Sequence, residues 1–163
     1  MSALIKFIRI NTFKTICKGN NNYKNIIKFA QKLTKSEQYM EQQRTTPEFI
    51  TELTPNEIFV FGSNLQGMHG GGAAYIAYRQ FGAIMGQGVG LQGQSYGIPT
   101  MQGGVETIRP YVDEFIEFAK EHPTLTFLVT RIGCGIAGFT DEEISPLFEK
   151  AHDVDNIVLP KGW

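Results

Sequence analysis

The distribution of apolar and polar residues along the chain predicts strands that alternate with helices. Short apolar runs rich in β-branched and aromatic residues are typical of buried strands in a parallel sheet. Such runs occupy residues 58–61, 96–99, 125–130 and 156–159. Between them, apolar residues recur at helical spacing over residues 71–81 and 104–121 and again after Thr140. This alternation requires parallel neighbours joined by right-handed crossovers, so the pattern predicts an α/β fold.

The expected helices differ in the signals that mark their faces and ends. The helix over 104–121 has one continuous apolar face, and Pro123 follows its end because proline cannot continue a helix. The helix after Thr140 begins with a capping box, in which Thr140 and Glu143 satisfy each other's backbone N–H groups. The helix over 71–81 is expected to bury one side, formed by Ala74, Ile76, Ala77, Tyr78 and Phe81, with its small residues facing the sheet.

A glycine-rich turn joins the first strand to the first helix. Gly70, Gly71 and Gly72 stand immediately before the helical pattern. Glycine lets the backbone adopt unusual angles and lets a ligand come close. The first N–H groups of a helix have no partner inside the helix, so a helix that opens on glycines offers an anion site. No Asp or Glu lies between Glu57 and Glu106, so no carboxylate competes for this helix start.

A second glycine-rich loop, residues 131–139, follows the strand over 125–130. In open α/β sheets, ligands bind in the crevice at the carboxyl ends of the strands. The helix after this loop starts with Asp141, Glu142 and Glu143, whose negative charges already interact with its dipole. A phosphate group is therefore expected at the helix that starts near Gly71, with residues 133–138 as the opposite wall.

Residues 82–97 are predicted to form a structured loop. They carry six glycines, with Met85, Val89 and Leu91 between them, and the gaps are too short for a helix. Gln87, Gln92 and Gln94 lie in the same segment. Their amide groups can read a base or ribose edge, or they can simply face solvent.

Charge is distributed unevenly along the chain. The 163 residues have a net charge of −1, and at this length we expect one domain. Residues 1–39 hold eight Lys or Arg and one acidic residue, whereas residues 40–163 hold seven basic and fifteen acidic residues, a net charge of −8. An acidic domain repels nucleic-acid phosphates, which argues against a nucleic-acid partner.

No apolar run approaches membrane-spanning length, so no membrane partner is expected.

The first 44 residues form a basic extension, and we expect the domain to cover residues 45–163. The extension is rich in Lys, Asn, Ile and Phe, unlike the remainder. Three interpretations stay open: a targeting peptide, a basic arm that touches nucleic acid or anionic lipid, or a translated or disordered leader ahead of Met40. A helix is plausible from Tyr23 to Tyr39 on its apolar spacing. No function is assigned to this segment.

Cysteine usage and motif spacing narrow the chemistry further. Cys17 and Cys134 lie in very different sequence contexts, so we do not expect a disulfide between them. We expect a reducing compartment such as the cytoplasm. The sequence has no zinc-type spacing and no Walker-type lysine. It therefore indicates neither a metal site nor nucleoside-triphosphate hydrolysis, and no cofactor is expected.

Three side chains in the glycine-rich loops are able to take part in chemistry. His69 can act as an acid or base, because histidines in general titrate near neutral pH, or it can serve only as a hydrogen-bonding loop residue. Cys134, surrounded by backbone N–H groups, can be a nucleophile or an inert thiol. Arg131 can pair with phosphate or form a structural salt bridge. No catalytic residue is assigned, and His69 and Cys134 are the candidates.

Both loops resemble the motifs of the macrodomain family, whose members bind ADP-ribose. Ser63-Asn64 followed by Gly70–Ile76 is similar to the family's Asn ahead of a helix led by three glycines. Residues 132–139 are similar to the family's loop that wraps the diphosphate. The span 58–163 resembles, more narrowly, a group of small phage and bacterial macro-like proteins. The resemblance implies a three-layer α/β/α macro-like fold with a mostly parallel central sheet.

The resemblance also implies a ligand, an ADP-ribose-like nucleotide, and the residues that bind it. Asn64 would face the distal ribose, and the two loops would hold the diphosphate. The implied ligand-binding residues are Gly62, Ser63, Asn64, His69, Gly70, Gly71, Gly72, Ala73, Arg131, Gly133, Cys134, Gly135, Ile136, Ala137, Gly138 and Phe139.

Three departures from the family pattern favour binding over hydrolysis. Catalytically active macrodomains often carry an Asp two residues after the triple glycine, where this chain has Ala74. The Asp that usually contacts adenine has no clear counterpart, and Glu52 is the nearest acid. Cys134 stands where a small hydroxyl residue is common.

Three functions from different classes stay open at this point. The first, which we prefer, is a binding module that sequesters a nucleotide signal of the ADP-ribose type. The second is a hydrolase that acts on ADP-ribosylated substrates. The third is an interaction domain in which the glycine-rich loops are purely structural. The sequence does not indicate an oligomeric state.

Overall fold

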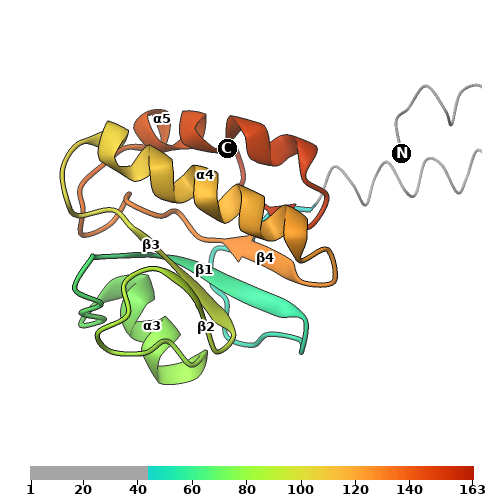
Figure 1. The fold of residues 1–163 in the computed structure, drawn as a ribbon, viewed down its shortest axis with the longest axis horizontal. Helices are drawn as coiled ribbons and strands as arrows, with labels where there is room; N and C mark the ends of the chain where they lie inside the picture. The colour runs from blue at the N-terminus through green and yellow to red at the C-terminus, as the bar shows by residue number, and fades with distance from the viewer. Residues whose placement is uncertain (1–43) are drawn as a thin grey trace, which may run out of the picture. The chain divides into compact units, whose positions relative to one another are not determined.

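A five-stranded sheet forms the centre of residues 44–163, the part of the chain that the computed structural model describes (Figure 1). The strands are β1 (Glu57–Ser63), β2 (Gly90–Gln92), β3 (Ser95–Pro99), β4 (Thr126–Val129) and β5 (Ile157–Val158). They lie in the order β2-β3-β1-β4-β5, and residues 45–163 form one compact unit. The expectations about the N-terminal extension, including the helix from Tyr23 to Tyr39, concern residues outside the described part.

Strand pairing makes the sheet mixed, with mostly parallel neighbours. β1 pairs in parallel with both β3 and β4, and β4 pairs in parallel with β5. β2 instead runs antiparallel to β3, with Leu91 opposite Tyr96. The predicted α/β class and the four expected strands are confirmed, and these four strands pair in parallel. β2, which was not predicted, adds one antiparallel pair.

A tight hairpin explains this additional strand. Gly93 and Gln94 alone connect β2 to β3, and Gly93 has a φ of +57°. Two-residue hairpin turns require positive φ angles, which glycine adopts without steric cost. The prediction of a loop over 82–97 missed β2 because its residues, Gly90, Leu91 and Gln92, show no recognisable strand pattern.

Helices cover both faces of the sheet: α3 (Gly72–Gln80) lies on one face, and α4 (Val105–Glu121) and α5 (Asp141–Ile144) lie on the other (Figure 1). α5 continues directly into η1, a 3₁₀ helix over Ser145–Asp153. Pro146 lies in the first turn of η1 and lacks the N–H group of an α-helical bond, which accounts for the change of helix type.

The predicted capping box before α5 is confirmed. The carboxylate of Glu143 accepts a hydrogen bond from the backbone N–H of Thr140 at 2.8 Å, and the Thr140 side chain caps the helix in return. The helix therefore begins where the sequence indicated, and three acidic residues occupy its first turn.

β1 supplies residues to two separate cores, because successive side chains of a strand point to opposite faces of a sheet. Ile58 and Val60 belong to the larger core beneath α4 and η1, whereas Phe59 and Phe61 belong to the smaller core beneath α3. α3 buries the small side chains of Ala74 and Ala77 against the sheet. The small residues therefore face the sheet as expected, whereas Ile76 and Tyr78, which were expected on the buried side of the helix, are 37% and 40% exposed.

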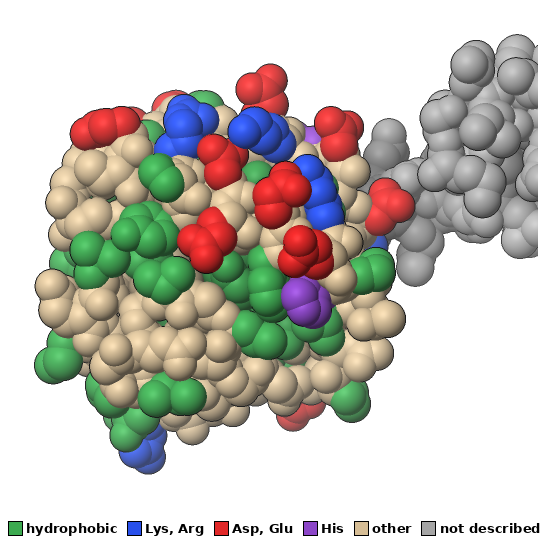
Figure 2. All heavy atoms as spheres, in the orientation of Figure 1, with side chains coloured by type: hydrophobic (Ala, Val, Ile, Leu, Met, Phe, Trp, Pro, Cys, Tyr) green, Lys and Arg blue, Asp and Glu red, His purple; other side chains and the backbone are tan. Residues whose placement is uncertain are grey.

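The surface over α4 is acidic, whereas the part formed by α3 and β2 shows mostly apolar and uncharged atoms (Figure 2). The acidic residues of α4 are Glu106, Asp113, Glu114, Glu117 and Glu121. Among residues 44–163, no helix combines the length and the apolar character needed to cross a membrane.

Candidate functional site

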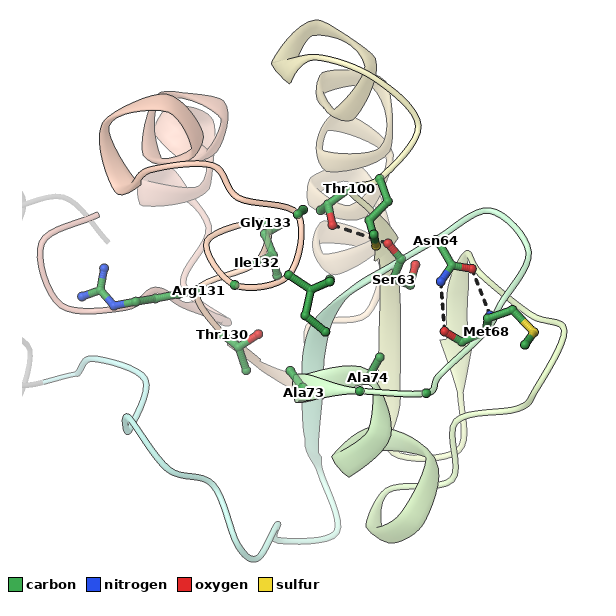
Figure 3. A pocket seen from close by; sticks show the side chains of 18 residues that line it. Ser63, Asn64, Met68, Ala73, Ala74, Thr100, Thr130, Arg131, Ile132 and Gly133 are labelled. Carbon is green, nitrogen blue, oxygen red and sulfur yellow. Dashed lines mark hydrogen bonds between the residues drawn. The ribbon is translucent and has the colours of Figure 1, made fainter.

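A cavity of about 360 Å³ opens at the carboxyl ends of β1, β3 and β4 (Figure 3). Residues 62–64, 68, 70–74, 100–101, 130–133 and 135–137 line it. β1 leads through α3 toward β3, and β4 leads through α5 and η1 toward β5, on the opposite side of β1. The chain therefore diverges between β1 and β4, which is the switch point where open α/β sheets bind ligands.

Gly62 allows these strand ends to converge. A Cβ atom at Gly62 would lie 3.2 Å from Oγ1 of Thr100, which follows β3, and 3.3 Å from the backbone nitrogen of Gly133, which follows β4. Both distances are tighter than ordinary van der Waals contacts. A side chain here would push the loops apart and widen the floor of the cavity.

The first wall of the cavity is the start of α3. The first hydrogen bond of this helix runs from the N–H of Tyr75 to the carbonyl of Gly71, at 3.2 Å. The N–H groups of Gly72, Ala73 and Ala74 therefore have no acceptor inside the helix. No acidic side chain lies in the first turn. Three donors and the positive end of the helix dipole thus serve this wall, which favours an anion.

The second wall is the loop over residues 133–138. Its turns are closed by bonds from Gly138 N–H to the carbonyl of Gly135 and from Phe139 N–H to the carbonyl of Gly133, both 3.0 Å. Within residues 44–163, the N–H groups of Gly135, Ile136 and Ala137 donate to no protein acceptor. All three residues line the cavity, so this wall also offers backbone donors.

Ile136 reaches from the second wall toward the first. Its side chain is 72% exposed, yet its Cδ1 atom lies 3.1 Å from the position that a Cβ atom on Gly71 would occupy. The corresponding distance to Gly72 is 3.7 Å. The two glycine-rich loops therefore meet through this one apolar side chain, at the helix start.

The polar side chains in the cavity are already engaged. Ser63 Oγ donates to the carbonyl of Gly88, and Thr130 Oγ1 donates to the carbonyl of Val60 at 2.9 Å. Arg131 is the one charged side chain among the residues that line the cavity in the described part of the chain, and these residues include no His, Cys, Asp, Glu or Lys. The groups left to contact a ligand are mainly backbone N–H groups.

Asn64 lines the cavity, but its side chain forms hydrogen bonds with the backbone of its own turn (Figure 3). Its Nδ2 atom donates to the carbonyl of Met68, and its Oδ1 atom accepts from the N–H of Met68, both at 2.9 Å. Each amide atom can form one further hydrogen bond. A contact from Asn64 to a ribose therefore stays a prediction, and it would use this remaining capacity.

His69 does not line the cavity. Its ring is fully buried, and Nε2 lies 3.0 Å from the carbonyl oxygen of Ile84 and 3.1 Å from that of Gln87. The ring also packs edge-on against Phe61, with centroids 5.3 Å apart. Its surroundings are those of a hydrogen-bonding loop residue rather than an acid or base in contact with ligand.

Cys134 points away from the cavity toward Asp141, with Sγ 3.5 Å from Oδ1 of that carboxylate. Burial, and next the hydrogen bond to Asp141, raise the pKa of the Cys134 thiol to about 11. The thiol is therefore protonated at neutral pH, which does not favour a nucleophilic role. Phe139 and Gly138 likewise do not line the cavity, although they belong to the same loop.

Asp141 anchors the second loop. It accepts a hydrogen bond from the indole Nε1 of Trp163 at 2.9 Å and forms an ion pair with Arg131. The Trp163 hydrogen bond and then the Arg131 hydrogen bond hold the pKa of the Asp141 carboxyl below its usual value of 3.8. Arg131 also donates to the carbonyl of Lys161 at 2.7 Å, so its guanidinium is a structural tie as well as part of the cavity wall.

Sequence reasoning missed part of the site. A second cavity of about 450 Å³ adjoins the first and shares Thr130 and Arg131 with it. Residues 45–48, 129 and 160–161 complete its lining. Thr100 and Met101 of the first cavity were also missed, although their place directly after β3 is the signal that identifies them. Gln87, Gln92 and Gln94 line neither cavity.

Comparison of the chain with protein-family models, with curated proteins and with solved structures gave no match.

Proposed function

We propose that residues 45–163 bind an ADP-ribose-type nucleotide and hold its diphosphate between the start of α3 and the loop over 133–138. One observation carries the proposal: among the described residues, two sets of unpaired backbone N–H groups line a single cavity whose lining includes no carboxylate. Preorganised amide donors at a helix start suit phosphate oxygens. The helices on both faces of the sheet are compatible with the three-layer macro-like fold that the sequence motifs suggest.

The second cavity supplies room for the remainder of such a ligand. At about 360 and 450 Å³, each cavity lies in the size range of small-molecule sites. We assign the diphosphate and distal ribose to the first cavity and the adenine base to the second. Glu48 lines the second cavity and can accept a hydrogen bond from an exocyclic amine, a role for which Glu52 is not positioned.

Binding without turnover is the form of this function that we propose. A hydrolase of this type needs a side chain that deprotonates water. The residues that line the first cavity include no such group within the described part of the chain. The engaged Ser63 and Thr130 hydroxyls do not supply one, because each already donates its proton to a backbone carbonyl.

Calorimetry with ADP-ribose, ADP and AMP tests the proposal. We expect ADP-ribose and ADP to bind, and AMP, which lacks the diphosphate, to bind more weakly. Gly71→Glu puts a carboxylate at the helix start and should lower affinity about tenfold or more, equivalent to about 1.4 kcal/mol. Its Cβ atom meets only the flexible end of Ile136, so the domain should stay folded.

Gly135→Val tests the opposite wall, and Gln80→Glu is the matched control. Open space surrounds the Cβ position of Gly135, so valine should obstruct the ligand without unfolding the chain. Gln80→Glu adds the same charge at the exposed far end of α3 and should leave affinity unchanged. If folded Gly71→Glu and Gly135→Val bind ADP-ribose like the parent, the diphosphate does not lie between these loops and the proposal fails.

A further inference from the structure

Buried polar side chains converge on one loop behind the glycine-rich turn, residues 84–88. Ser63, His69 and Gln92 are each at most 3% exposed. Ser63 donates to the carbonyl of Gly88 at the end of this loop. Buried polar groups are costly without partners, so hydrogen bonds of this kind fix the position of the loop that they contact.

His69 and Gln92 hold the middle of the loop from two sides. His69 Nε2 lies 3.0 Å from the carbonyl oxygen of Ile84 and 3.1 Å from that of Gln87. Gln92 accepts from the N–H of Ile84 at 2.7 Å and donates to the carbonyl of Gln87 at 3.1 Å. Both groups facing His69 Nε2 are acceptors, so this nitrogen must carry the proton.

The backbone of the turn is interlocked with the same loop. The N–H of Gly86 donates to the carbonyl of Gly67 at 3.0 Å. A Cβ atom on Gly67, whose φ is +65°, would lie 2.3 Å from the backbone nitrogen of Gln87. The turn and the loop therefore pack at a distance that no other residue at Gly67 permits.

We propose that His69 is a positioning residue for the anion site. It stands between Met68 and Gly70, which both line the cavity, and its ring ties them to the loop over 84–88. The tie fixes the path of Gly70 to Gly72 into α3 and so preorganises the N–H groups at the helix start. The inference rests on the proposed function and adds to it a residue that does not touch the ligand.

The His69 ring is held with Nε2 as the donor to the loop over 84–88. Nδ1 is buried and has no hydrogen-bond partner within the described residues. Arg79, on the last turn of α3, is the one charged residue between Glu57 and Glu106. Apart from Glu57 at the start of β1, which accepts a hydrogen bond from the N–H of Thr54, the segments β1, α3, β2 and 84–88 carry no carboxylate.

Two substitutions at His69 distinguish the effect of losing the N–H donor from the effect of losing the imidazole ring. His69→Gln carries a neutral N–H donor near the position of Nε2 and should keep ADP-ribose affinity within about threefold of the parent. His69→Asn carries an amide that reaches only the position of Nδ1, and it should lose affinity about tenfold or more. Val112→Ala is the control for general destabilisation, because Val112 is a buried residue of α4, in the core on the other face of the sheet.

Affinity is measured by calorimetry well below the melting temperature of every variant. The proposal is overturned if His69→Asn binds like the parent, if His69→Gln loses as much affinity as His69→Asn, or if Val112→Ala loses a comparable amount. Should His69→Asn not fold, Gln92→Met takes its place, since it removes the hold on the loop from the other side. Parent affinity in folded Gln92→Met then overturns the role of the loop and, with it, the proposal.

Amide hydrogen exchange in the protein without ligand tests the positioning role of His69 independently of the proposed function. The amides to follow are those of Gly86, bonded to Gly67, and Tyr75, which makes the first bond of α3. His69→Asn should speed their exchange about tenfold or more relative to amides of β4, whereas His69→Gln and Val112→Ala should not. A parent that fails to bind ADP-ribose removes the proposed function, and unchanged relative exchange in His69→Asn removes the positioning role.

Discussion

At the scale of single residues, Asp141 connects the second loop to residues that lie before it and far after it in the sequence. Its carboxylate contacts the guanidinium of Arg131 before the loop, the thiol of Cys134 within it and the indole of Trp163 at the end of the sequence. The Trp163 ring also packs against Phe148, with centroids 5.3 Å apart. One carboxylate therefore ties the cavity wall to η1 and to the C-terminal residue.

Asp141 should make the stability of the domain depend on acidic pH. Its folded-state pKa lies below the usual 3.8, so its charged form stabilises the folded state above that value, and the contribution is lost as the pH falls through the folded pKa. We expect the difference in unfolding free energy between the parent and Asp141→Asn to be largest at neutral pH and to shrink below about pH 4. Urea unfolding at pH 7, 4 and 3 checks this, and a difference that grows on acidification would contradict it.

The roles of side chains could be predicted only where they depend on near neighbours. The capping box of Thr140 and Glu143 spans three residues and was correctly predicted. The partners of His69 lie 15 and 18 residues along the chain, and Asp141 bonds to Trp163 at a separation of 22 residues. Such contacts depend on the tertiary path of the chain, so the sequence placed His69 and Cys134 in the right loops without revealing what they contact.

At the scale of elements, the hairpin between β2 and β3 depends on Gly93. Its φ of +57° strains any other residue, and a Cβ atom there would lie 2.8 Å from the Cα atom of Gly82. Gly93→Ala should therefore lower the unfolding free energy by about 1 kcal/mol or more. The matched control is Gly135→Ala, whose Cβ position is open and whose φ is not positive, and it should change stability little. Equal stability of the two variants in urea would mean that the turn does not constrain the hairpin.

Elements whose own residues show a strong hydrophobic periodicity could be predicted, whereas elements that depend on pairing with another segment could not. The buried apolar positions of α4 recur at helical spacing, so its bounds were expected within one residue. β2 is a strand only because the turn at Gly93 brings it against β3. The change from α5 to η1 depends on Pro146, which the sequence pattern did not lead us to read as a change of helix type.

At the scale of the whole molecule, the switch point between β1 and β4 brings the two glycine-rich loops together. The sequence predicted two loops at the carboxyl ends of parallel strands, and hence one wall from each. The second cavity could not be predicted, because residues 45–48 reach it through an isolated bridge between Thr46 and Pro160. That bridge joins two segments far apart in the sequence, and no hydrophobic pattern or motif in either segment indicates that they pair.

The protein should bind its ligand without turning it over. Incubation with ADP-ribosylated protein and with ADP-ribose 1″-phosphate should release no more product than a heat-inactivated control, because the cavity lining holds no general acid or base in the described residues. Chromatography of the released nucleotide is the measurement. Multiple turnovers would contradict the binding function.

The nearly uncharged segment between Glu57 and Glu106 has a consequence for how binding responds to ionic strength. Mobile ions screen interactions between separated charges over a Debye length of about 10 Å at 0.1 M salt, but they screen a dipole in direct contact with its anion much less. In this site the donors are backbone amides, and the nearest cation, Arg131, is already paired with Asp141. ADP-ribose affinity measured from 50 to 500 mM sodium chloride should therefore fall by less than about threefold, in contrast to sites that rely on clusters of lysine and arginine. Selectivity would then come from the directions of the amide dipoles, so that chloride, although abundant and negatively charged, competes poorly with a diphosphate.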